Sequence, residues 1–175
     1  MDLKTNICDS IKECEIKLGY QEKTIHLYYP ESTLLELLGA EYRNLAEKIA
    51  LFCQTQAEIF GDITIAETQE KGRYCIDVPA KGVKYVHENM AASSFMATFV
   101  RKIHKPGGKK EDIVKLFYEF SNDVVVEKME EKEWAVYFQD GIPDGYVYYI
   151  EEDDFGLQYH RFTRETFERF KENEL

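Results

Sequence analysis

Trp-Ala-Val-Tyr-Phe-Gln at residues 134–139 lies between two similar runs, Asn-Asp-Val-Val-Val-Glu-Lys-Met at 122–129 and Tyr-Val-Tyr-Tyr-Ile-Glu at 146–151. Two Asp-Gly pairs, at 140–141 and 144–145, separate the run at 134–139 from the run at 146–151. An acidic segment with Gly156 precedes a fourth run at 157–162. β-branched and aromatic side chains favour strands, and connections this short join antiparallel neighbours. The segment therefore predicts a four-stranded antiparallel meander.

Alternation with a period of two places Trp134, Val136 and Phe138 on one face of the predicted meander, which we expect to be the core face. Ala135 and Tyr137 lie on the other face, which is also partly apolar. We therefore expect a helix to cover part of this second face as well.

The rest of the chain predicts helices and one further hairpin. Apolar residues at helical spacing indicate helices at 3–18, 41–60, 94–104 and 111–120, and shorter ones after Thr33, Pro79 and Thr163. Residues 63–68 and 73–78 read as a central hairpin, and residues 24–29 as an extended segment without an evident partner. The predicted class is α+β, with five to seven helices packed against an antiparallel sheet of six strands.

Composition limits the domain organisation and the setting. A chain of 175 residues without a linker rich in Ser, Gly or Pro predicts a single domain over residues 1–175. The start lacks a basic segment followed by an apolar run, and no stretch is long enough to span a bilayer, so we expect a cytoplasmic protein that does not enter membranes. The four cysteines show no Cys-x-x-Cys pair, which favours reduced, mostly buried thiols.

The charge is acidic overall but unevenly distributed. The chain holds 33 acids against 22 bases, a formal net charge of −11, which disfavours binding to nucleic acid and favours a basic protein partner. Within this acidic chain, residues 91–121 carry six bases and only three acids. This basic island is the feature most suggestive of a ligand site.

The basic island contains a Pro-Gly-Gly turn directly before a predicted helix, an arrangement that can aim backbone N–H groups at an anion. We name Arg101, Lys105, Lys109 and Lys110 as candidate anion-binding residues, with His160 as a fifth candidate on the last strand. The alternative explanation is structural, because bases also complement the dipole at a helix C-terminus and strand histidines are mostly surface residues.

Other chemical signals are weak. The histidines at 26, 87, 104 and 160 have no metal-binding spacing, and the acidic run 151–154 lacks the ligand pattern of a calcium loop. Arg73, Cys75 and Asp77 share one strand face, where the cation could activate the thiol, but a buried and inert thiol is the favoured interpretation. The sequence predicts no metal, no cofactor and no catalytic residue, and it leaves open whether the protein is an enzyme.

Three segments carry a resemblance, namely Gly-Arg-Tyr-Cys-Ile-Asp at 72–77, Tyr-Val-His-Glu at 85–88 and Tyr-His-Arg-Phe-Thr at 159–163. With these segments, the whole chain resembles a family of small bacterial proteins known as a domain of unknown function. The resemblance implies a bacterial cytoplasmic setting and a single domain, and it transfers no site.

Two functional hypotheses follow from these observations. The first is a non-catalytic binding or regulatory protein that uses its acidic surface to bind a basic partner. The second is a small-molecule enzyme or anionic-ligand binder that uses residues 101–110 and His160.

Overall fold

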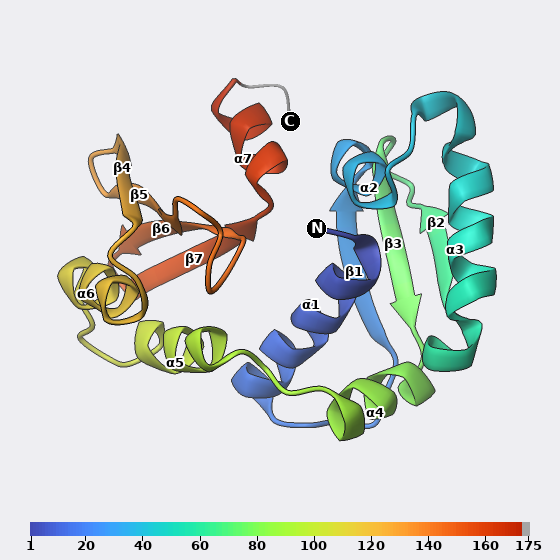
Figure 1. Cartoon of the computed structure of the whole chain (residues 1–175), viewed down its shortest axis with the longest axis horizontal. Helices are drawn as coiled ribbons and strands as arrows, with labels where there is room; N and C mark the ends of the chain where they lie inside the picture. The colour runs from blue at the N-terminus through green and yellow to red at the C-terminus, as the bar shows by residue number, and fades with distance from the viewer. Residues whose placement is uncertain (173–175) are drawn as a thin grey trace. The chain divides into compact units, whose positions relative to one another are not determined.

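The computed structural model describes residues 1–172 and has the predicted α+β class (Figure 1). The chain divides into two compact units, Met1–Ala92 and a second unit that begins at Ser93. The single domain expected over residues 1–175 stays a prediction. Within the described residues, no helix is both long enough and apolar enough to cross a membrane.

The first unit combines a three-stranded antiparallel sheet of order β1-β3-β2 with four α-helices and a short 3₁₀ helix. Its elements are α1 (Leu3–Leu18), β1 (Ile25–Pro30), α2 (Glu31–Leu38), η1 (Tyr42–Asn44), α3 (Leu45–Phe60), β2 (Thr64–Glu67), β3 (Arg73–Val78) and α4 (Ala80–Asn89).

One face of this sheet is covered and the other is open. Ile76 and Val78 of β3 are fully buried in a core that includes Ile7 of α1, Phe60 of α3 and Val86 of α4. The alternate side chains of the three strands point to the opposite face, where His26, Tyr28, Thr64 and Ala66 are exposed. A sheet with helices on one side only leaves the second side available to solvent or to a ligand.

The second unit is built on the predicted meander. Its elements are α5 (Ser94–Ile103), α6 (Lys110–Phe120), β4 (Val124–Glu130), β5 (Glu133–Phe138), β6 (Val147–Asp153), β7 (Gly156–Phe162) and α7 (Arg164–Lys171). The four strands pair antiparallel in the order β4-β5-β6-β7, as the sequence predicts.

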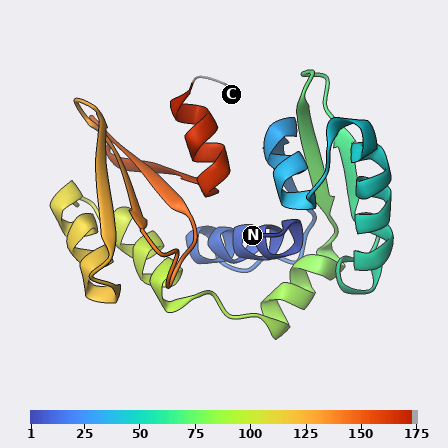
Figure 2. The ribbon, with the colours of Figure 1, turned by 45° about the horizontal axis from the view of Figure 1, so that its top comes forward.

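Helices cover both faces of the meander, which confirms the alternation argument (Figure 2). On the first face, the rings of Phe95 in α5 and Phe117 in α6 pack against Phe138 of β5 at centroid distances of 4.9 and 5.0 Å. On the second face, Phe170 of α7 packs edge-on against Tyr149 of β6 at 5.2 Å. Rings on both sides therefore fill the core of this unit.

Three predicted details are wrong. The strands form two separate sheets rather than one of six strands, because residues 25–30 become β1 and pair with β3 in the first unit. Thr33 does not cap α2, which begins at Glu31 after Pro30, whose fixed φ suits the position before a helix. The helix expected at 41–60 begins with the 3₁₀ turn η1, and α3 follows from Leu45.

Candidate functional site

The open face of the three-stranded sheet carries a cluster of three side chains that can bind metal ions. Antiparallel pairing places His26 of β1 opposite Asp77 of β3, and Tyr28 of β1 opposite Cys75. Residues two apart on one strand share a face, so Cys75 and Asp77 lie side by side. His26, Cys75 and Asp77 are thereby brought together from two strands.

Asp77 contacts both of the other side chains. Nδ1 of His26 lies 2.6 Å from Oδ1 of Asp77, and Sγ of Cys75 lies 3.2 Å from the same oxygen. One potential ligand atom from each residue falls within 4.8 Å of the other two. The side chains of His26 and Asp77 are 56% and 45% exposed, so an ion in solution can reach the cluster directly.

The ionisation of the cluster follows from its contacts. The hydrogen bond to His26, followed by the one to Cys75, lowers the pKa of the Asp77 carboxyl. Burial raises the pKa of the Cys75 thiol, and the hydrogen bond to Asp77 together with the carboxylate charge raises it further. A hydrogen bond with Tyr28 acts in the opposite direction, but the raising effects dominate and hold Cys75 as a thiol without a metal. A bound cation would favour the thiolate.

The donor set fits a borderline transition-metal ion. Imidazole nitrogen, thiolate sulfur and carboxylate oxygen are the three donor types that bind Zn²⁺ in proteins. A tetrahedral zinc ion with bonds of about 2.0–2.3 Å holds its ligand atoms roughly 3.3–3.7 Å apart. The ligand atoms of the cluster, which lie within 4.8 Å of one another, are close to this spacing, and a fourth position would remain for water or another ligand.

Alternation along residues 73–78 predicts that Arg73, Cys75 and Asp77 share one face, but it gives no indication that His26 joins them. The Arg73 guanidinium lies 5.4 Å from the centroid of the Tyr28 ring and pairs with Glu70 at 3.1 Å. The Cys75 side chain is partly exposed rather than buried. The only sequence signal for His26 was its alternation with Tyr28 on a short extended segment, and the pairing of that segment was not evident.

The structure places the four predicted basic residues around the connection between α5 and α6. Arg101, Lys105 and Lys109 are exposed, whereas Lys110 lies over the Trp134 ring at 4.3 Å from its centroid. The first turn of α6 already carries Glu111 and Asp112, and a carboxylate oxygen of Asp112 accepts a hydrogen bond from the Lys109 backbone N–H at 3.3 Å. These acids oppose an anion at the helix N-terminus. Anion binding here stays a prediction.

The structure does not bring His160 together with the basic residues. Tyr159 packs edge-on against Phe99 of α5 at a centroid distance of 4.9 Å, so the alternating His160 points to the opposite face of the meander, which α7 covers. Its Nε2 atom lies 3.7 Å from a Glu151 carboxylate oxygen. An acid rather than a base is thus the charged neighbour of His160.

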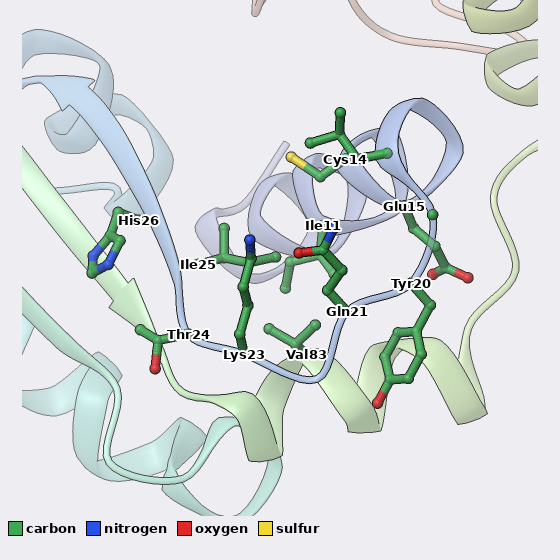
Figure 3. A pocket seen from close by; sticks show the side chains of 12 residues that line it. Ile11, Cys14, Glu15, Tyr20, Gln21, Lys23, Thr24, Ile25, His26 and Val83 are labelled. Atoms are coloured by element: carbon green, nitrogen blue, oxygen red, sulfur yellow. The ribbon is translucent and has the colours of Figure 1, made fainter.

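An apolar pocket of about 230 Å³ borders the cluster (Figure 3). Ile11 of α1, Ile25 of β1 and Val83 of α4 form its apolar wall, and Figure 3 shows His26 at the opposite end from Glu15 and Tyr20. The pocket is below the roughly 300–1,000 Å³ that is usual for small-molecule sites. We therefore assign the metal-binding potential to the sheet face and no ligand to this pocket.

Comparison with known proteins gives one match. Neither the curated proteins nor the solved structures contain a match to this chain. A family profile matches residues 1–170, which is nearly the whole chain, and its description is "Domain of unknown function, E. rectale Gene description (DUF3877)". The chain belongs to this family of uncharacterised domains.

Proposed function

We propose that the protein is a binding protein for a divalent transition-metal ion of the zinc class, held by His26, Cys75 and Asp77. The convergence of three different ligand types on one open sheet face is the observation that carries the proposal. On binding, Cys75 would lose its proton, so that one thiolate and one carboxylate balance the charge of the ion.

The surroundings of the cluster favour binding over catalysis. The side chains of His26 and Asp77 are about half exposed on a pleated surface and Cys75 is partly exposed, whereas catalytic sites exclude water to strengthen their electrostatic interactions. The raised pKa of Cys75 also disfavours a thiolate nucleophile without metal. These points support a non-catalytic role.

Cobalt titration of the untagged 175-residue chain tests the metal site. Co²⁺ bound to a thiolate gives a near-ultraviolet charge-transfer absorption, which we expect for the wild type and not for Cys75→Ser. We expect His26→Gln to weaken the affinity at least about tenfold, in line with the loss of one ligand. Cys53→Ser is the matched control, since Cys53 is also partly exposed but lies in α3. An unchanged absorption in Cys75→Ser would refute the proposal.

A second candidate function is docking of a basic protein partner, and the β6–β7 hairpin favours it. Phe155 at the hairpin tip is 94% exposed and follows Glu152, Asp153 and Asp154. An exposed aromatic ring beside carboxylates suits a partner rich in Lys and Arg. A lysine- and arginine-rich peptide should bind the wild type in a salt-dependent manner and Phe155→Ser more weakly. Equal binding of the two proteins would count against this surface.

We also propose that the protein does not bind nucleic acid and that it is cytoplasmic. The net charge of −11 supports a protein that does not bind nucleic acid, because a phosphate backbone would be repelled. The unpaired thiols of Cys53 and Cys75 support a reducing, cytoplasmic setting. Fractionation of cells that express the chain measures the location.

A further inference from the structure

A cavity of about 740 Å³ lies between the start of α3 and the β2–β3 hairpin of the first unit. Its volume is within the range of small-molecule sites. Leu45, Ala46 and Ile49 of α3 and Ile65 of β2 supply an apolar lining. The cavity and the metal cluster are separate, because Ile65 and Tyr74 pack toward the helix-covered core while His26 and Cys75 lie on the open face.

Two acidic and two aromatic side chains also line the cavity, namely Glu31, Glu67, Tyr42 and Tyr74. The Tyr74 hydroxyl donates a hydrogen bond of 3.4 Å to Oε1 of Glu31, and Oε1 of Glu67 accepts one of 2.8 Å from the Gly72 backbone N–H. Tyr42 is 74% exposed. Two carboxylates and two phenol rings thus border the same space as the aliphatic wall.

We infer that this cavity binds an alkylammonium group, with the cation at Glu31, Glu67 and the two tyrosines and the aliphatic body against α3. A carboxylate accepts hydrogen bonds from an ammonium group, and tyrosine faces attract cations through their ring quadrupole. A metal ion or an anion would not use the aliphatic wall. Lys71 also lines the cavity, which leaves two negative charges against one positive charge.

The electrostatics of Tyr74 support this arrangement. Burial raises the pKa of Tyr74, and Glu31, Glu67 and Tyr42 each raise it further. Glu31, Glu67 and Tyr42 therefore all act on one phenol group, in keeping with their shared position around the cavity. A positive ligand placed there would interact favourably with both carboxylates.

An alkylammonium group has two sources, a free amine and the lysine side chain of a protein partner. Calorimetric titration of the full chain with butylammonium measures the first source, and titration with a short lysine peptide measures the second. Butanol, which has the same body without a charge, and the acetyl-lysine form of the peptide are the matched controls. We expect saturable binding of at least one ammonium probe and none of the uncharged probes.

Variants decide whether such binding occurs in the cavity. We expect Glu31→Gln and Tyr42→Ala each to weaken binding at least tenfold, and Glu58→Gln and Tyr118→Ala to leave it unchanged, because the last two residues are exposed and lie outside the cavity lining. The exposed Tyr42 can be truncated without loss of a core contact. No binding of either ammonium probe, or equal effects of the cavity and control variants, would overturn the inference. The cobalt test at Cys75 is unaffected by either result.

Discussion

Nδ1 of His26 lies 2.6 Å from Oδ1 of Asp77, although the two residues are 51 positions apart in the chain. The antiparallel register of β1 and β3 creates this contact, and it adds Cys75 to the same face. Because the contact is solvent-exposed, its value to the metal-free protein is small. Its importance in the proposed function is that it preorganises two metal ligands.

Replacement of His26 should therefore lower the free energy of unfolding more in the presence of metal than in its absence. With a chelator, we expect His26→Gln to change the free energy of unfolding by less than about 1 kcal/mol. With Zn²⁺ at about 100 times its dissociation constant, the wild type should gain about 2.7 kcal/mol and the variant much less. Urea denaturation with and without Zn²⁺ measures both values. An equal gain for the two proteins would place the metal elsewhere.

Gly82 should be intolerant of a side chain because α4 approaches the end of α3 there. A Cβ atom at Gly82 would lie 2.9 Å from both the Cα and the carbonyl oxygen of Phe60. These are backbone atoms, so relief requires one helix to shift, and we expect Gly82→Ala to cost about 1–3 kcal/mol. Lys84→Ala in the same helix is the control and should cost within about 0.5 kcal/mol. Thermal unfolding distinguishes the two.

The meander and its two faces could be predicted because the evidence for them is local. Alternation of Trp134, Val136 and Phe138 is visible within six residues, and short turns leave neighbouring strands little choice of partner. The same is true of the helix stop at Gly19, which has a φ of 78°, and of the cap at Thr163, whose side chain accepts from the Thr166 N–H.

The division into two sheets and the metal cluster could not be predicted, because both depend on contacts between segments that are distant in the sequence. The pairing of β1 with β3 joins segments more than forty residues apart, and nothing in the composition of residues 24–29 identifies the partner. His26 is recognisable as a candidate metal ligand only once the strand pairing places it opposite Asp77. Spacing rules for metal sites describe ligands on one turn or one helix, so they do not detect a set assembled by strand register.

Phe95 should be the most sensitive position of the second unit. Its fully buried ring packs edge-on against Phe117 at 4.8 Å and Phe138 at 4.9 Å, and also meets Phe120 and Tyr148. Truncation would leave a cavity in this ring cluster, so we expect Phe95→Ala to cost about 3–5 kcal/mol. The exposed Tyr118 provides the control, because Tyr118→Ala should change stability by no more than about 0.5 kcal/mol. Similar losses in the two variants would contradict the packing.

The acid stability of the first unit should depend on Glu15. One carboxylate oxygen accepts a hydrogen bond of 3.0 Å from the nearly buried Lys12 ammonium, and the other lies 2.8 Å from Nδ1 of His87. Burial alone would raise the pKa of Glu15, but the hydrogen bonds to Lys12 and His87 outweigh it and lower this pKa below its ordinary value. Glu15 therefore stabilises the fold above its unfolded-state pKa of about 4.3, and this contribution is lost as the pH falls through the lower folded-state value.

Replacement of Glu15 by glutamine should reproduce this loss at neutral pH. We expect Glu15→Gln to cost about 1–3 kcal/mol near pH 7, because the Lys12 ammonium loses its charged partner, and the difference from the wild type should shrink as the pH falls below about 4. Glu88→Gln is the control, since Glu88 is exposed on α4 and its replacement should change the stability by no more than about 0.5 kcal/mol. Urea denaturation across this pH range measures both differences. A Glu15→Gln penalty that stays constant down to about pH 3 would mean that packing, rather than charge, explains the loss.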